Sequence, residues 1–334
     1  MDVPCWESTV GATLHASQSY AMTHHHTHSP GTSCGHGHGH GLAPQHFDRA
    51  MAAGVALNTL FVACEAVAGA VSGSLALLAD AGHNAGDVLG LLLAWGAAWL
   101  ARRPPSRRYT WGLRRSTIYA ALANAVLLLV ACGGIAWEAV HRLRSPEPVA
   151  GPVVIAVAAV GVVINTLTAL LFLRGHGDAN VRGAFLHMAA DAAVSLGVVL
   201  AGVAIALTGA AWIDPLVSLA VAAMIVAGTW GLFRESLDLA LDAVPRGVEP
   251  EAIEAALAGL PGVAEVHDLH VWGASTSEIS LTVHLVVSDG VDRDAVLAEA
   301  ETLLRDRFRV AHSTIQIESV AVGPSCVQRP AEAL

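Results

Sequence analysis

The sequence contains no lysine and has few charged residues of any kind. Charged side chains make up 14% of the 334 residues, against about 25% in an average soluble domain. Hydrophobic residues make up 54% of the chain. This balance excludes an ordinary soluble domain and indicates an integral membrane protein.

Cysteine is present, but its spacing is not that of a small domain cross-linked by disulfides. The odd set of five forms no CxxC pair: Cys5, Cys34, Cys64, Cys132 and Cys326. A disulfide framework is therefore excluded. The chain also lacks the charged start and apolar run of a secretory signal peptide, and the HExxH motif of metalloproteases. We therefore expect neither a cleaved leader nor an enzyme.

Apolar runs dominate the middle of the chain, and each is close to the about 20 residues that a membrane-spanning helix needs. They lie at 49–71, 76–100, 115–140, 150–173, 183–207 and 212–233. The loop "ARRPPSRRYTWGLRR" after the second run holds six arginines. Arginine-rich loops stay in the cytoplasm, and six spans return the chain to the side where it began. We expect a multi-pass protein of the inner (cytoplasmic) membrane with both termini in the cytoplasm.

The two ends of the chain differ from its middle. Residues 1–46 are polar and rich in histidine and glycine, which is typical of a disordered tail. After a membrane domain at 47–238, helix and strand patterns alternate in the order α-β-β-α-β, from "EPEAIEAALAG" at 249–259 to "STIQIES" at 313–319. We expect a cytoplasmic α+β domain at 239–320, followed by a disordered tail at 321–334.

Two of the apolar runs carry the same polar pair. His83 and Asp87 are four residues apart in "LLADAGHNAGDVLGLLL", and His187 and Asp191 repeat this spacing in "FLHMAADAAVSLG". Residues four apart project from one face of a helix. An ionised Asp in the middle of a membrane helix costs at least about 2.5 kcal/mol, so the repeated pair calls for a partner.

Two imidazole nitrogens and two carboxylate oxygens form a ligand set that Zn²⁺ accepts in tetrahedral geometry. The alternative is two separate His–Asp hydrogen bonds that hold the helix bundle together. Asp80 lies one turn before His83 and either orients that imidazole or faces water at the cytoplasmic mouth. If the four residues bind a metal, protons compete with it for the ligands, and a proton gradient can drive export.

The segments "LLADAGHNAGDVLGL", "HGDANVRGAFLHMAADAAVSLGVV", "WIDP", "VHDLHVW" and "STIQIES" together resemble the cation diffusion facilitator family, in its bacterial zinc-exporting branch. The resemblance implies a homodimer of six-helix protomers with a metallochaperone-like cytoplasmic domain. It implies antiport of divalent metal against protons and a transport site at His83, Asp87, His187 and Asp191. It also implies a regulatory metal site at the dimer interface of the cytoplasmic domain, with His267, His284, His312 and Glu318 as ligands. The alternative there is an ordinary polar sheet face.

The N-terminal tail holds further imidazoles and Cys34, and histidine-rich tracts bind metals loosely. The tail is either a cytosolic zinc collector or a dispensable solvated segment. His176, in a short loop, is a candidate for metal entry. The candidate tail ligands are His24, His25, His26, His28, His36, His38 and His40.

These features predict a zinc/proton antiporter that moves Zn²⁺ out of the cytoplasm. Its partners would be divalent metal ions, protons, the lipid bilayer and a second copy of the chain, with no nucleic acid. The same ligands admit cobalt, nickel or cadmium, because selectivity depends on geometry and availability. A membrane-anchored metal sensor is the alternative from another class, and it would move no ions.

Overall fold

The computed structural model describes the backbone of residues 49–173, 179–323, 326 and 328, and their side chains except at 49–57 and 171–184. The histidine-rich tail and His176 lie outside the described residues. What was expected of them stays a prediction.

Six long helices account for the apolar runs, and the expected fold class is confirmed. They are α1 (Arg49–Ser72), α2 (Leu75–Ala101), α3 (Ser116–Arg144), α4 (Gly151–Leu173), α5 (Ala179–Thr208) and α6 (Ile213–Ala240). Five of them are long and apolar enough to cross a membrane over their described residues, and the described part of α1, Asn58–Ser72, is a shorter apolar helix. The last helix continues past the predicted end at 233, through the polar residues Arg234, Glu235 and Asp238.

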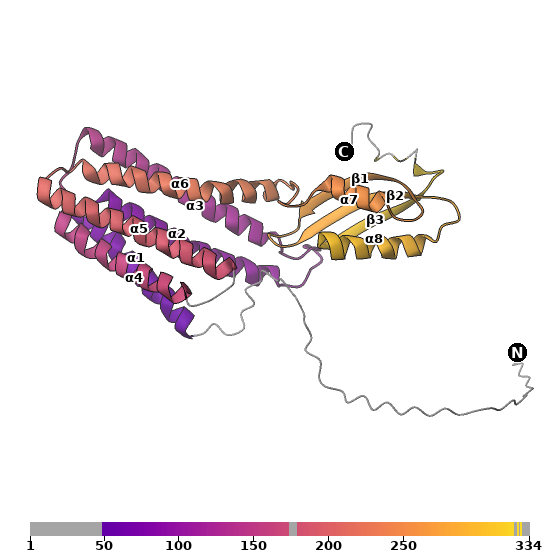
Figure 1. The fold of residues 1–334 in the computed structure, drawn as a ribbon, viewed down its shortest axis with the longest axis horizontal. Coiled ribbons are helices and arrows are strands. Elements are labelled where there is room, and N and C mark those ends of the chain that lie inside the picture. The colour runs from indigo at the N-terminus through magenta and orange to yellow at the C-terminus, as the bar shows by residue number, and fades with distance from the viewer. Residues whose placement is uncertain (1–48, 174–178, 324–325, 327, 329–334) are drawn as a thin grey trace, which may run out of the picture. The chain divides into compact units, whose positions relative to one another are not determined.

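Helix α2 lies at the centre of the bundle, where it contacts α1, α3, α5 and α6. The closest helix pairs are α3 with α6 and α4 with α5, which run side by side in Figure 1. In contrast, α2 and α5 approach each other only over a short stretch. The two helices that carry the repeated His–Asp pairs are therefore neighbours without being tightly packed along their length.

The C-terminal domain is the expected α-β-β-α-β unit. Its elements are α7 (Pro250–Ala258), β1 (Val263–Gly273), β2 (Ile279–Val287), α8 (Arg293–Phe308) and β3 (Val310–Ser319). The sheet order is β1-β2-β3. Strands β1 and β2 pair antiparallel, whereas β2 and β3 pair parallel across the α8 connection. A parallel pair needs such a crossover, so the long α8 segment between the last two strands follows from the topology.

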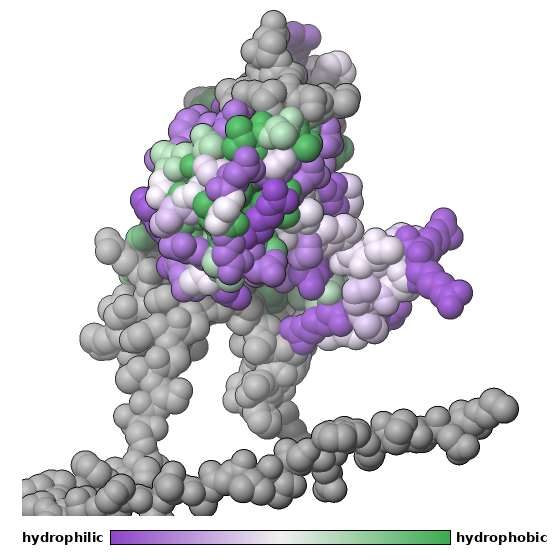
Figure 2. All heavy atoms as spheres, turned by 90° about the vertical axis from the view of Figure 1, so that its right-hand side faces the viewer, coloured by the Kyte–Doolittle hydropathy of each residue, from purple (hydrophilic) through white to green (hydrophobic). Residues whose placement is uncertain are grey.

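Alternation along the strands gives the sheet two different faces. Leu281, Val283 and Leu285 of β2 point to one face and pack with Ile253 of α7 and Leu304 of α8 in the domain core. Residues of the opposite parity, including His284 and Glu318, point to the face that these helices leave uncovered. The side of the molecule seen in Figure 2 shows mainly hydrophilic side chains with scattered hydrophobic ones.

Candidate metal centres

The start of α2 is held by a carboxylate from another helix. Ser74 caps α2 and accepts a hydrogen bond from the Leu77 amide at 3.1 Å. Its hydroxyl donates to Asp214 of α6 at 2.5 Å. Asp214, which is 1% exposed, also accepts from the Leu75 and Ala76 amides at 2.7 and 3.3 Å. Because the first amides of a helix lack partners within it, this carboxylate fixes α2, and with it His83, relative to α6.

The two His–Asp pairs face each other between α2 and α5. His83 Nε2 lies 3.1 Å from Asp191 Oδ1 and 3.9 Å from Asp87 Oδ2. His187 Nε2 lies 3.2 Å from Asp87 Oδ2 and 3.7 Å from Asp191 Oδ2. Each imidazole therefore faces both carboxylates, one on its own helix and one on the neighbouring helix.

Part of this group has the spacing of a metal site, since ligand atoms of His83, Asp87 and Asp191 all lie within 4.8 Å of one another. Ligand atoms about 2.0 Å from a tetrahedral zinc lie about 3.3 Å from one another, and the four imidazole–carboxylate distances run from 3.1 to 3.9 Å. The group is buried on one side and open on the other, since the Asp191 side chain is 1% exposed and that of His187 is 46% exposed. His83, Asp87 and Asp191 can therefore approach one cation together, while His187 contacts both carboxylates from the exposed side.

The layer behind this group contains further buried carboxyls. Asp80 is fully buried and accepts from the Ser195 hydroxyl at 2.8 Å, and Glu65 accepts from the Asn84 amide at 3.3 Å. His83 Nδ1 is buried and has no hydrogen-bond partner among the described residues. Asp80 thus neither faces water nor receives a hydrogen bond from His83. It faces α5 instead.

The uncovered face of the C-terminal sheet carries a second group of ligand atoms. His267 of β1 and His284 of β2 are directly opposite in the register, and their ring centroids are 5.2 Å apart. Glu318 of β3 pairs with Val286, two residues beyond His284, so it points to the same face. His267 Nε2 and His284 Nδ1 lie 3.6 and 3.2 Å from the two Glu318 oxygens.

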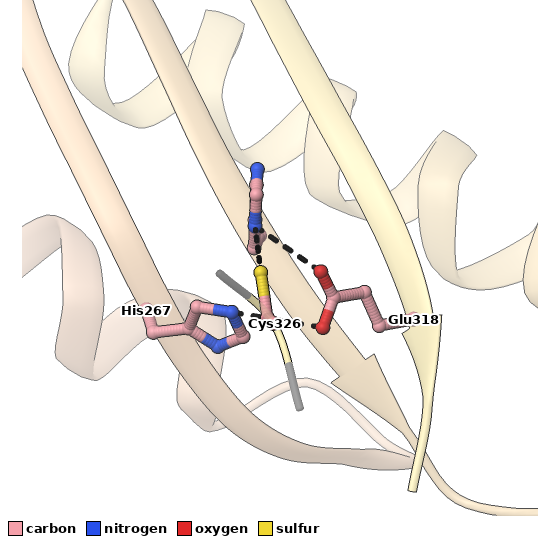
Figure 3. A group of neighbouring side chains, drawn as sticks. His267, Glu318 and Cys326 are labelled. Carbon is pink, nitrogen blue, oxygen red and sulfur yellow. Dashed lines mark hydrogen bonds and ion pairs between the residues drawn. The ribbon is translucent and has the colours of Figure 1, made fainter. Parts of the chain in front are cut away.

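Cys326, which follows β3 in the sequence, completes this group. Its sulfur lies 3.6 Å from His284 Nδ1. Ligand atoms from His267, His284, Glu318 and Cys326 all lie within 4.8 Å of one another. Figure 3 shows the labelled side chains of His267, Glu318 and Cys326 pointing toward a common centre.

His312, which the resemblance placed in this group, lies elsewhere. It is on the same face of β3 as Glu318, but six residues earlier, which corresponds to about 20 Å along a strand. It pairs with Ser280, and its ring contacts Trp111 at a centroid distance of 4.7 Å. The alternation along β3 therefore puts His312 on the same face as Glu318, but His312 is too far along the strand to reach the other ligands.

A kink in β1 brings one more carboxylate to the group. The register shifts between His267 and His270, and Asp268 adopts a left-handed backbone there, with φ of 51°. Such bulges redirect side chains. The Asp268 carboxylate lies 3.5 Å from His284 Nε2, while Nδ1 of the same ring faces Glu318 and Cys326. An acceptor behind an imidazole favours a proton on Nε2 and leaves Nδ1 as the ligand atom.

The electrostatics of the group suit a cation. Burial raises the pKa of Glu318. Hydrogen bonds from Gln316 and Cys326, together with the nearby imidazoles, lower this pKa by more than burial raises it, so it lies below the usual value. A hydrogen bond from the Gln328 backbone lowers the pKa of the Cys326 thiol, yet burial and the Glu318 carboxylate outweigh it, so this pKa is raised. The carboxyl is therefore ionised, and the thiol keeps its proton until a cation displaces it.

Sequence reasoning missed Cys326, Asp268 and the capping role of Asp214. Cys326 lies in a segment without helix or strand periodicity, where spacing says nothing about position in space. Asp268 stands between the two histidines of "VHDLH", which was a usable signal for an orienting carboxylate. Asp214 contacts residues about 140 positions away, and a sequence alone does not show that pairing.

With this geometry in place, comparison with known proteins identifies the family. Residues 51–239 match the cation efflux transmembrane domain, and residues 245–320 match the cytoplasmic domain of cation efflux proteins. The chain belongs to the cation efflux family.

Several characterised relatives are similar over most of their length. The metal cation efflux system protein CzcD of Cupriavidus metallidurans is 35% identical, over 81% of this chain and 86% of its own. The zinc transporter ZitB of Escherichia coli is 37% identical, over 80% and 86%. A Bacillus subtilis relative, 32% identical over 79% and 86%, is named a cadmium, cobalt and zinc/H(+)-K(+) antiporter. The metal-bound C-terminal domain of the CzcD transporter matches 21% of this chain and 99% of its own, at 39% identity and a TM-score of 0.21.

Proposed function

We propose that the protein exports a divalent metal cation, Zn²⁺ in particular, from the cytoplasm in exchange for protons. The observation that carries this proposal is the convergence of His83, Asp87, His187 and Asp191 between α2 and α5. Two helices that each bring a carboxylate into an apolar bundle need a positive partner there. A divalent cation supplies that charge and accepts all four ligand atoms.

Proton coupling follows from the same ligands. To bind the cation the two imidazoles must be neutral and the two carboxylates ionised. A proton that reaches an imidazole therefore competes with the metal, and imidazole titrates in the physiological range. If the site opens to each side in turn, protons that enter from outside release the metal there. The name of the Bacillus subtilis relative, which includes H(+), supports this exchange.

Zinc is the favoured substrate because two imidazoles and two carboxylates are a ligand set that Zn²⁺ accepts, and because one relative is named a zinc transporter. Cobalt, nickel and cadmium accept the same ligands. The names of the relatives include cadmium and cobalt, so these ions belong in the same assay as zinc.

The proposal also includes the membrane location of the protein, its oligomeric state and its other metal-binding residues. The protein is a homodimer in the inner membrane, with both termini and the C-terminal domain in the cytoplasm, where the arginine-rich loop at 101–115 also lies. His267, His284 and Glu318 bind a second, regulatory Zn²⁺. The N-terminal histidines collect metal loosely and deliver it to the bundle.

Zinc flux into proteoliposomes under an imposed pH gradient tests the proposal. The intact protein is compared with Asp87→Ala and Asp191→Ala, with cobalt and cadmium measured alongside. Glu147→Gln is the matched control, because this carboxylate is 60% exposed and pairs only with Arg142 among the ion pairs found. We expect gradient-dependent zinc uptake in the intact protein and the control, and none in the two Asp variants.

Each other result would change the proposal in a defined way. Uptake that survives in both Asp variants would move the transport site away from α2 and α5. Uptake that is indifferent to the pH gradient would remove the antiport. A folded protein that moves no metal at all would favour the membrane-anchored sensor.

A further inference from the structure

We propose that Cys326 supplies a thiolate ligand to the cytoplasmic metal site, so that binding of a borderline-soft cation holds Cys326 against the face of the sheet that α7 and α8 leave uncovered. The inference rests on the cytoplasmic metal site of the proposed function, but not on transport. The site then has two nitrogens, one oxygen and one sulfur, all from one protomer.

The first support is that three buried polar atoms of the group make no hydrogen bond within the described residues: His267 Nδ1, His267 Nε2 and Glu318 Oε2. His267 is 8% exposed, and neither of its ring nitrogens makes a hydrogen bond within the described part of the chain. Glu318 is 4% exposed, and its Oε2 is likewise without a hydrogen bond there. Buried polar atoms without partners destabilise the folded state. A cation at the centre of the group would satisfy His267 Nε2 and Glu318 Oε2 together.

The second support is the position of the sulfur. Around a tetrahedral zinc, with Zn–S near 2.3 Å and Zn–N near 2.0 Å, a sulfur and a nitrogen lie about 3.5 Å apart. The Cys326 sulfur is 3.6 Å from His284 Nδ1. The Glu318 carboxylate lies against the same imidazole, with Oε1 3.2 Å from His284 Nδ1. His267, whose Nε2 is 3.6 Å from Glu318 Oε2, needs only a small movement to join them.

The third support is the orientation of His284. Asp268 lies behind this imidazole, on the side away from Cys326. Metal-binding histidines nearly always have such an acceptor on their second nitrogen. Asp268 is therefore a positioning residue, which acts on the metal through His284.

The chemistry of the step balances simply. The Cys326 S–H bond breaks, its proton passes to solvent, and a metal–sulfur bond forms, with no change of oxidation state. Thiolate sulfur favours Zn²⁺ and similar soft or borderline cations over Mg²⁺ or Ca²⁺. The transport site between α2 and α5 offers only nitrogen and oxygen, so a sulfur signature distinguishes the two centres.

Cobalt absorption of the full-length protein in detergent tests the proposal. Co²⁺ alone is the probe, because a cobalt–thiolate bond produces a charge-transfer band in the near ultraviolet that nitrogen and oxygen ligands do not. The background is Cys5→Ser with Cys34→Ser, which removes both cysteines of the N-terminal tail. Within it, Cys326→Ser is compared with the matched control Cys64→Ser, whose cysteine lies exposed on α1.

We expect the band in the background protein and in Cys64→Ser, and its complete loss in Cys326→Ser. A band that persists in Cys326→Ser, or is missing from the background protein, would overturn the thiolate ligand. If the band is missing but His267→Gln still changes the visible cobalt spectrum, the cytoplasmic site stands without sulfur. Zinc flux is read separately, so a failure of transport would not be mistaken for a failure of this proposal.

Discussion

The two proposed metal centres of this protein use similar residue types in opposite ways. The centre between α2 and α5 is half open, with an Asp191 side chain 1% exposed and a His187 side chain 46% exposed. The centre on the C-terminal sheet is closed, since His267, His284 and Glu318 are all buried. The first group stands on two helices that meet only briefly, and the second on three hydrogen-bonded strands.

The difference suits the two tasks that we propose for bound metal. A transport site has to release its ion, so it benefits from an open side and from ligands on elements that can move apart. A regulatory site has to hold its ion and report it, so rigid strands and a sulfur ligand suit it. Four variants test this difference, in order of decreasing expected effect.

The largest effect is expected for Asp191→Asn. This carboxylate contacts both His83 and His187, and its loss removes a negative charge as well as a ligand. Because changes to residues that merely support ligands cost about 10–100-fold in affinity, we expect zinc flux to fall by more than about 100-fold. Proteoliposome flux measures this, and the cobalt–thiolate band of the same protein should stay unchanged. A matching loss of that band would show that the two centres are not separate.

A smaller effect is expected for Asp268→Asn. The variant keeps the size of the side chain but weakens the acceptor behind His284, so we expect the affinity of the cytoplasmic site to fall by about 10–100-fold. Competition with a chromophoric zinc chelator measures it. Asp289→Asn, on an exposed turn, is the control. An unchanged affinity would mean that Asp268 does not orient the ligand.

A moderate loss of stability, without loss of ligands, is expected for Asp214→Asn. The amide keeps one acceptor oxygen, so at least one of the donors at Ser74, Leu75 and Ala76 loses its partner. Buried donors without partners cost about 1–3 kcal/mol. The midpoint of thermal unfolding in detergent should fall, while Co²⁺ binding at the cytoplasmic site is retained. Unfolding at the original temperature would contradict the capping role.

The smallest effect is expected for His312→Gln. This residue is about 20 Å along β3 from Glu318, so the zinc affinity of the cytoplasmic site should not change. The same chelator competition tests it, with Cys326→Ser as the positive comparison. A clear loss of affinity in His312→Gln would restore His312 to the ligand set and would place Cys326 in doubt.

Much of the fold could be predicted because its signals are local. The length of each apolar run matches the membrane thickness, so six helices follow from hydropathy alone. β-Branched residues and flanking turns predict strands such as Ile279–Val287. The pairs His83–Asp87 and His187–Asp191 share helix faces because of their spacing. The contact between the two pairs depends on how α2 and α5 pack, and the spacing within each helix does not predict that packing.

By itself, then, the sequence determined the membrane class, the order of the elements and the face on which each ligand stands. These depend on composition and on periods of two or 3.6 residues. Only the tertiary structure decided which faces meet and at what distance. It brought Cys326 to His284, left His312 far along the strand and placed Asp214 at the start of α2. The physical reason is that periodicity fixes direction, whereas proximity depends on register, crossover and helix packing between residues remote in the chain.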